Sequence, residues 1–192
     1  MQYENLKDTV LERLENELSK DLHYHSVAHT RDVIAACAAS ADRRGLTEEN
    51  KVLLMSAAVL HDIGFLNTTK DHELEGVSIA KKMLPSFGYT SDHVQRISDM
   101  IMATKIPQSP KSELGCMICD ADLDYLGRDD FYKIGSTLFA ELQAHSVLQT
   151  EQEWDAIQIK FLSSHSFHTE WSIRVREPVK QKYLMELKQK WK

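Results

Sequence analysis

Histidine and aspartate are the side chains with which this chain could do chemistry, because it carries 9 histidines and a formal net charge of −6. His61 and Asp62 end the apolar run 52–60, whose composition predicts a helix that is buried on most faces. Burying an unpaired carboxylate is very costly, whereas a carboxylate and a neutral imidazole that share a divalent cation stabilise each other. The pair is therefore a candidate metal site, although one His-Asp pair also arises by chance in a chain of this composition.

A second candidate pair, His25 and His29, lies four residues apart in the sequence. The two side chains share one helix face if the helix already begins near His25. Taken alone, this pair is more typical of a solvated helix start than of a pair of ligands.

Three acids alternate between positions 120 and 124, namely Asp120, Asp122 and Asp124. On a helix, the neighbours of Asp122 one turn away are largely apolar: Ile118, Cys119, Tyr125 and Leu126. A carboxylate within an apolar stripe requires a cation, so the pattern favours Asp122 as a ligand. Periodicity alone leaves Asp120 open as the alternative.

Helices must position these residues, because the chain has only 4 prolines and 7 glycines and no segment alternates like a strand. Gly45 should end the second helix, Thr47 should cap the third, and Pro178 should start or kink the last. We therefore expect an all-α fold with one helix from Thr47 to the His61-Asp62 pair and others at about 3–20, 26–43, 72–84, 91–104, 112–126, 129–147, 151–166 and 170–191.

Composition narrows the class of protein. A chain of 192 residues with 42% hydrophobic residues suits one domain over 1–192, with a metal-binding core at about 20–130 and a helical extension at about 130–192. The negative net charge argues against a nucleic-acid polymer as partner. No apolar run is long enough for a bilayer, no signal-peptide pattern begins the chain, and three unpatterned cysteines suit a reducing compartment. We expect a cytoplasmic protein with a small substrate and no membrane partner.

Taken together, His29, the pair His61-Asp62 and Asp122 resemble, in this order, the HD superfamily of metal-dependent phosphohydrolases over roughly residues 20–130. The resemblance implies a single HD-domain helical bundle with additional C-terminal helices, in which these four residues bind a divalent metal. The stretch 120–124 also looks like the DADxLD segment of bacterial HD proteins. The second acid of that segment is the ligand, which decides for Asp122 over Asp120.

The segment from Tyr24 to Val33 is similar to the YHNxxHAxDV segment of cyclic-nucleotide phosphodiesterases. The first histidine of that segment protonates the leaving oxygen, so the likeness implies that His25 is a general acid. Ser26 and Thr30 depart from the segment, and the nucleotide-selecting glutamine region of that family has no counterpart here. The likeness supports a catalytic acid and does not identify a cyclic nucleotide as the substrate.

Some HD proteins hold two metals, with further histidines after the His-Asp pair and near an Ile-x-x-His segment. His72 could supply the first, but Thr104 stands in the place of the second. We therefore expect one tight metal site. Mixed imidazole and carboxylate ligands accept manganese, zinc, iron, nickel or magnesium, so the ligand set does not select the metal.

The resemblance implies an enzyme, a phosphomonoesterase or phosphodiesterase that acts on a small phosphate ester such as a nucleotide or cyclic nucleotide. Metal-activated water would attack phosphorus, Asp62 or Asp122 would orient it, and His25 would act as the general acid. Four further residues are candidates for substrate contact or for support of the site: His72, Lys105, Arg128 and Asp120.

Two other interpretations belong to different classes. The protein could be a catalytically weak HD-domain module that binds nucleotide and metal for regulation, or a helical adaptor that binds no metal. An exposed apolar face on one of the late helices could also form a homodimer.

Overall fold

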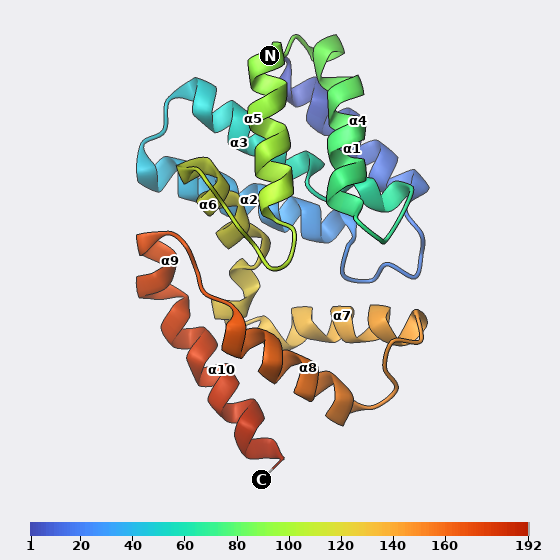
Figure 1. The fold of residues 1–192 in the computed structure, drawn as a ribbon, viewed down its shortest axis with the longest axis vertical. Coiled ribbons are helices and arrows are strands. Elements are labelled where there is room, and N and C mark those ends of the chain that lie inside the picture. The colour runs from blue at the N-terminus through green and yellow to red at the C-terminus, as the bar shows by residue number, and fades with distance from the viewer. Residues whose placement is uncertain (192) are drawn as a thin grey trace. The chain divides into compact units, whose positions relative to one another are not determined.

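The computed structural model, which describes residues 1–191, is all-helical (Figure 1). Over that range it contains ten α-helices, three 3-10 helices and no strand, which confirms the predicted fold class. The helices group into two compact units. The first contains Met1–Ser19 and His25–Asp122, and the second contains Lys20–Tyr24 and the described residues from Leu123 onward. The expected single domain over 1–192 stays a prediction.

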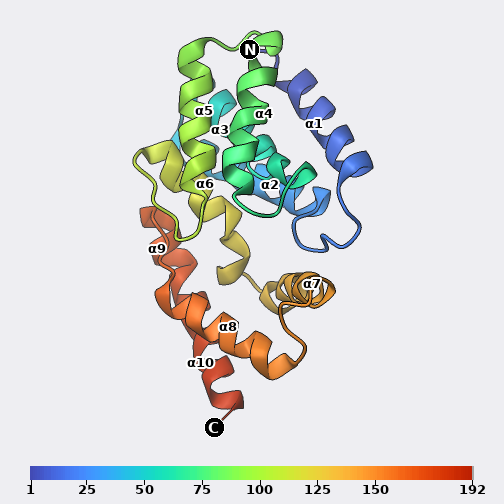
Figure 2. The ribbon, with the colours of Figure 1, turned by 45° about the vertical axis from the view of Figure 1, so that its right-hand side comes forward.

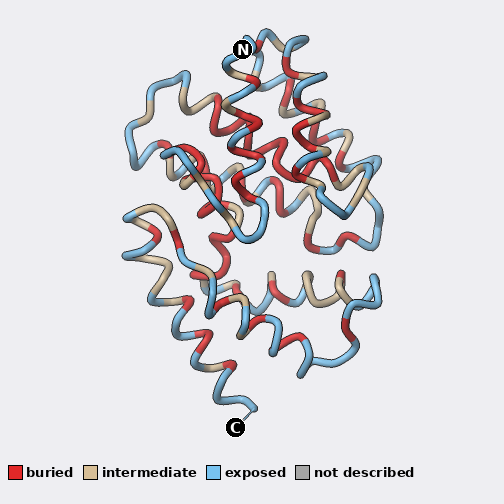
Figure 3. Tube along the Cα trace, viewed as in Figure 1, coloured by how far each residue is buried: buried red, intermediate tan, exposed pale blue. Residues whose placement is uncertain are grey.

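The first unit is built around one buried helix, α3 (Glu48–Leu60). Every residue of α3 from Leu53 to Leu60 is buried, as the red tube of Figure 3 shows, because this stretch is almost entirely apolar. Its helical neighbours are α1 (Tyr3–Glu17), α2 (Val27–Arg44), α5 (Ser91–Ala103) and α6 (Glu113–Asp122).

The remaining helices of the first unit are α4 (His72–Met83) and two short 3-10 helices, η1 (Ile63–Leu66) and η2 (Leu84–Phe87). Helices α4 and α5 lie side by side, and α4 also packs on η1 (Figure 2). The predicted C-terminus of α2 is confirmed, since Gly45 follows it with a left-handed φ of 65°. The predicted N-terminus of α3 is also confirmed, since the Thr47 side chain accepts a hydrogen bond from the backbone N–H of Asn50.

The second unit contains η3 (Asp124–Gly127), α7 (Phe131–Ala144), α8 (Glu151–Ser164), α9 (Glu170–Val175) and α10 (Glu177–Lys190). Helix α10 packs on α8, α9 and η3. The core of this unit is apolar and partly aromatic, with Phe131 and Tyr183 stacked at a ring-centroid distance of 4.5 Å. Over residues 1–191 no helix is both long and apolar enough to cross a membrane.

Two predicted helices are each divided in the structure. The span 112–126 breaks at Leu123 (φ −110°, ψ 19°) into α6 and η3, so Asp122 is the last residue of a helix. The span 170–191 breaks at Arg176 into α9 and α10, with Pro178 at the second position of α10. Proline has no N–H and clashes with the preceding turn, so it begins a helix more readily than it continues one. Periodicity missed both breaks because the apolar spacing runs through them.

Candidate metal centre

Four side chains from three helices of the first unit converge on one point. His29 lies in the first turn of α2, His61 and Asp62 directly follow α3, and Asp122 ends α6. His29 Nε2 is 3.2 Å from His61 Nε2 and 3.2 Å from Asp122 Oδ1. Asp62 Oδ2 lies 3.1 Å from His61 Nε2 and 3.4 Å from His29 Nε2. The structure thus brings together the residues that the sequence predicts as ligands, and their role stays a prediction.

The hydrogen bonds around His61 indicate which of its ring nitrogens faces the cluster as an electron-pair donor. Its Nδ1 lies 2.8 Å from the backbone carbonyl of Ala58, a distance at which an Nδ1–H donates to the oxygen. In the neutral ring, Nε2 then carries a lone pair that points at the cluster. This second contact, an imidazole held through its other nitrogen by a carbonyl, is typical of histidines that bind metals.

Asp62 supplies the strongest sign that a cation belongs in the cluster. Its Oδ2 atom is buried and, among the described residues, accepts no hydrogen bond. A buried carboxylate oxygen that accepts no hydrogen bond is costly, even with imidazoles nearby. Two imidazoles, this oxygen and the carboxylate of Asp122 are also the donor types that divalent transition metals bind. The residues present therefore fit a divalent metal ion.

The imidazole of His61 and the carboxylates of Asp62 and Asp122 shift each other's pKa values, and each shift favours the charged form. Complete burial lowers the pKa of His61, but the carboxylates of Asp62 and Asp122 outweigh burial and raise this pKa well above its ordinary value. Burial raises the pKa of Asp122, but hydrogen bonds from His29 and His61 outweigh it and bring this pKa down to about 2. The carboxylates thus remain ionised and favour positive charge among them.

His72 and Glu73 lie beside the other oxygen of Asp62. His72 Nε2 is 3.4 Å from Asp62 Oδ1 and 3.5 Å from Glu73 Oε1. Both residues begin α4, and Glu73 is buried. The sequence predicted a role for His72 but not for Glu73. In a helix of mixed polarity, the sequence does not indicate which acid is buried. Asp120 is buried on α6 but is not part of the group formed by His29, His61 and Asp122.

His25 precedes α2, which begins at Val27 with Ser26 as its N-cap. The helix therefore does not extend back to His25, and a shared helix face is not what brings His25 close to His29. Their ring centroids are 6.2 Å apart in an edge-on arrangement. The ring of Phe65, which the sequence analysis did not identify, stacks on His25 at 4.2 Å and on His72 at 4.0 Å.

The cations considered as phosphate contacts are engaged elsewhere. Lys105 Nζ forms an exposed ion pair with Asp71 Oδ1 at 2.5 Å. Arg128 belongs to the second unit, where its guanidinium binds Asp130 at 2.9 and 2.7 Å. Thr104, the residue in place of a histidine, is buried and donates its hydroxyl to the carbonyl of Ile101. Lys105 and Arg128 as substrate contacts stay predictions.

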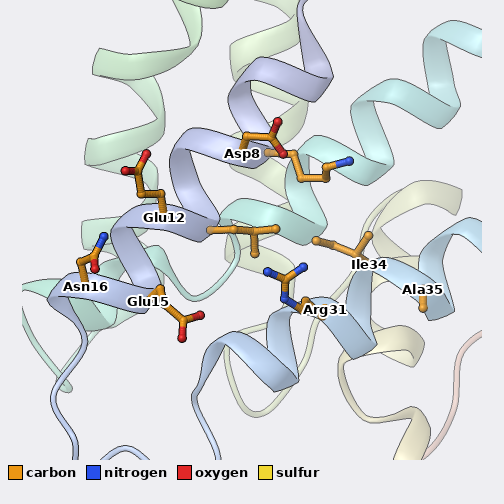
Figure 4. A pocket seen from close by; sticks show the side chains of 9 residues that line it. Asp8, Glu12, Glu15, Asn16, Arg31, Ile34 and Ala35 are labelled. Atoms are coloured by element: carbon orange, nitrogen blue, oxygen red, sulfur yellow. The ribbon is translucent and has the colours of Figure 1, made fainter.

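A surface groove elsewhere in the first unit lies between α1 and α2 (Figure 4). Asp8, Glu12 and Glu15 line it from α1, and Arg31 and Ile34 line it from α2. None of the residues that line this groove belongs to the His and Asp cluster. The groove is therefore not the candidate site.

Comparison with known proteins supports the fold and identifies the family. A predicted HD superfamily hydrolase from an uncultured Thermotogales bacterium has a TM-score of 0.65 at 22% identity, over 98% of this chain and 90% of that one. Bacillus subtilis YpgQ, solved in complex with ADP, has a TM-score of 0.65 at 16% identity, over 98% of this chain and 97% of that one. No curated protein matches the chain. The HD domain model matches residues 27–124, just over half of the chain, and the chain therefore belongs to the HD domain family.

Proposed function

We propose that this protein is a metal-dependent phosphohydrolase that acts on a small phosphate ester. The observation that carries the proposal is the convergence of His29, His61, Asp62 and Asp122, with the Asp62 Oδ2 atom buried and without a hydrogen bond. Membership of the HD domain family supports the same class of reaction. Manganese, zinc, iron, nickel and magnesium all suit the ligand types, and we expect one tight site.

The four ligands would hold the ion through two ring nitrogens and two carboxylates. A divalent metal bound there would supply a Lewis acid for the phosphoryl oxygens and would lower the pKa of bound water to about 7. An oxygen of Asp62 or Asp122 would orient the attacking water. His25, whose ring lies edge-on to that of His29, would donate a proton to the leaving oxygen, a role that typically contributes about 10²- to 10⁴-fold in rate.

A nucleotide or cyclic nucleotide is the substrate class we favour. The net charge of −6 argues against a polymer of phosphates, whereas a metal centre can bind one or a few phosphate groups locally. The crystal structure of Bacillus subtilis YpgQ in complex with ADP supports a nucleotide ligand for this fold. Lys105 and Arg128 remain candidates for additional phosphate contacts, and each would first have to leave its aspartate partner.

The test is hydrolysis of a panel of nucleotides and cyclic nucleotides with Mn²⁺, Mg²⁺ or Zn²⁺ added. Asp62→Ala should lose turnover and stoichiometric metal, whereas Asp99→Ala, an exposed aspartate on α5, should keep both. Turnover of the wild type that disappears with chelator and in Asp62→Ala would support the proposal. Turnover that survives in Asp62→Ala would contradict it.

The alternative is a regulatory module that binds metal and nucleotide without appreciable turnover. The same panel separates the two functions, because a module of this kind would bind metal in a 1:1 ratio and show no hydrolysis of any substrate. Retention of His25 beside the ligands favours the enzyme, since metal binding alone does not need a proton donor.

A further inference from the structure

Phe65 places a non-titratable ring between two of the histidines near Asp62. Its ring stacks on His25 at a centroid distance of 4.2 Å and an interplanar angle of 27°. It stacks on His72 at 4.0 Å and 26°. The two imidazoles are 6.1 Å apart at 52°, so the phenyl ring is the common neighbour of both.

The backbone around Phe65 is held rigidly against α4. The N–H of Phe65 donates to the carbonyl of Asp62 at 3.0 Å, which ties this residue to a metal ligand. The preceding residue, Gly64, lies so close to α4 that a Cβ atom would be 1.9 Å from the carbonyl oxygen of His72 and 2.8 Å from the backbone nitrogen of Gly76. Only glycine allows this approach. The place of the phenyl ring relative to His72 is therefore set by the backbone.

His25 is less restrained by secondary structure and burial than the candidate ligand His29. His29 is held by a helix and is buried, whereas His25 lies before α2 and is only half-buried. A side chain in irregular structure keeps more rotamers and loses more entropy when it is ordered. Stacking on a fixed aromatic ring limits the orientations of the imidazole without neutralising it or competing for its ring nitrogens.

We infer that Phe65 is a positioning residue that orients the imidazoles of His25 and His72 beside the ligand cluster. The phenyl ring has no group that could bind a metal or transfer a proton, so it acts through contact alone. Its consequence for turnover rests on the proposed phosphohydrolase function. Its effect on the orientation of the two imidazoles does not, and can be measured separately.

The test compares Phe65→Leu with Phe65→Tyr and Phe65→Trp, which keep an aromatic face. Phe87→Leu is the matched control, because Phe87 is also half-buried in a 3-10 helix of the same unit but lies outside the histidine group. The first readout is the NMR resonances of the imidazole protons in the Zn²⁺ protein, with His25→Gln and His72→Gln for assignment. The second is the Zn²⁺ dissociation constant.

We expect the His25 and His72 resonances to move in Phe65→Leu, where the ring current of the phenyl group is lost, and to stay closer to wild type in the two aromatic variants. The Zn²⁺ dissociation constant should change by less than about threefold in all of them, because the rings on which Phe65 stacks, His25 and His72, are not among the four candidate ligands and a phenyl ring donates no hydrogen bond to a ligand. Unchanged imidazole resonances in Phe65→Leu, or equal changes in Phe87→Leu, would overturn the inference. These readouts decide it even if the wild type hydrolyses nothing, an outcome that would contradict the proposed function instead.

If the wild type is active, two aryl phosphates add a kinetic readout. A misoriented proton donor should slow hydrolysis of phenyl phosphate by about tenfold or more, because a poor leaving group needs the proton. Hydrolysis of p-nitrophenyl phosphate, whose leaving group needs none, should fall by less than about threefold. Equal losses for both esters in Phe65→Leu would show a general structural defect and would overturn the inference.

Discussion

Asp122 and Asp124 are separated by one residue, yet their charges are compensated in different ways. In the first unit Asp122 faces two imidazoles, and its Oδ1 atom lies 3.2 Å from His29 Nε2. In the second unit Asp124 accepts two hydrogen bonds from the Arg176 guanidinium, at 2.7 and 2.9 Å. Arg128 lies 3.5 Å from the same carboxylate. Each aspartate is largely or partly buried, but only Asp124 meets a permanent positive charge.

The two aspartates differ in the chemistry of the side chain that each one faces, a guanidinium or an imidazole. A guanidinium is always charged and matches a carboxylate with two parallel N–H donors, so Asp124 is satisfied within the chain. An imidazole is neutral or charged according to pH and its surroundings, so it offers a carboxylate no permanent positive charge. The charge of Asp124 is thus compensated within the chain, whereas the charges of Asp62 and Asp122 would be compensated by the proposed ion.

A second buried charge in the C-terminal unit follows the same rule as Asp124. Lys180 is 0% exposed, and its ammonium lies 2.9 Å from Glu177 and donates to the carbonyl of His165. Asp124 and Lys180 thus have charged or carbonyl partners, whereas one oxygen of Asp62 accepts no hydrogen bond.

The largest expected effect is the stabilisation of the wild type by metal. At a free metal concentration of 100 times the dissociation constant, the free energy of unfolding should rise by about 2.7 kcal/mol, which is roughly 5–10 °C in Tm for a chain of this size. Asp62→Ala should lose this increase, whereas Asp124→Ala should keep it. Thermal unfolding with and without Mn²⁺ measures both, and an equal increase in all three proteins would remove the distinction between the two clusters.

The next effect concerns stability without metal. Asp124→Ala should lower the free energy of unfolding by about 2 kcal/mol, because it leaves Arg176 and Arg128 partly buried without their carboxylate. Asp62→Ala should change it by less than about 1 kcal/mol in protein stripped of metal, since it removes a carboxylate that has no hydrogen bond on one oxygen. Urea unfolding of the chelator-treated proteins gives the values. The reverse order would show that Asp62 is fully compensated by the histidines.

A smaller effect is the pH dependence of metal binding. Burial opposes the charge on His61, but Asp62 and Asp122 raise its pKa well above the ordinary value, so a proton competes with metal for this ring in neutral solution. Affinity should therefore fall as pH falls, by about tenfold per unit for one displaced proton. Calorimetric titration at several pH values, in buffers of different ionisation enthalpy, counts the protons released. Binding that is independent of pH would mean that His61 is already neutral.

The smallest effect is expected at Lys105, whose ion pair with Asp71 is exposed. Exposed pairs contribute little to stability, so Lys105→Ala should leave Tm within about 1 °C of the wild type. The KM of Lys105→Ala for the best substrate of the panel should then be compared with that of the wild type. A rise of about tenfold or more would identify Lys105 as a phosphate contact, because a charge-assisted hydrogen bond is worth that much.

Helices and their caps follow from the local sequence of this chain more directly than the partners of its buried side chains. Gly45 and Thr47 act through their own backbone and their near neighbours, so their roles are visible in the local sequence. The pairing of Asp124 with Arg176 joins residues 52 positions apart and has no local signal. Phe65 was missed for the same reason, because its contacts with His25 and His72 depend on how η1 packs against α4.

By itself, the sequence determined the helical class and the order of the candidate ligands along the chain, because these depend on composition and on local periodicity. The tertiary structure decided that His29, His61, Asp62 and Asp122 meet, that one oxygen of Asp62 is buried without a hydrogen bond, and that Phe65 stacks on His25. These are distances between atoms on different helices. They follow from how the helices pack around α3, which no local pattern specifies.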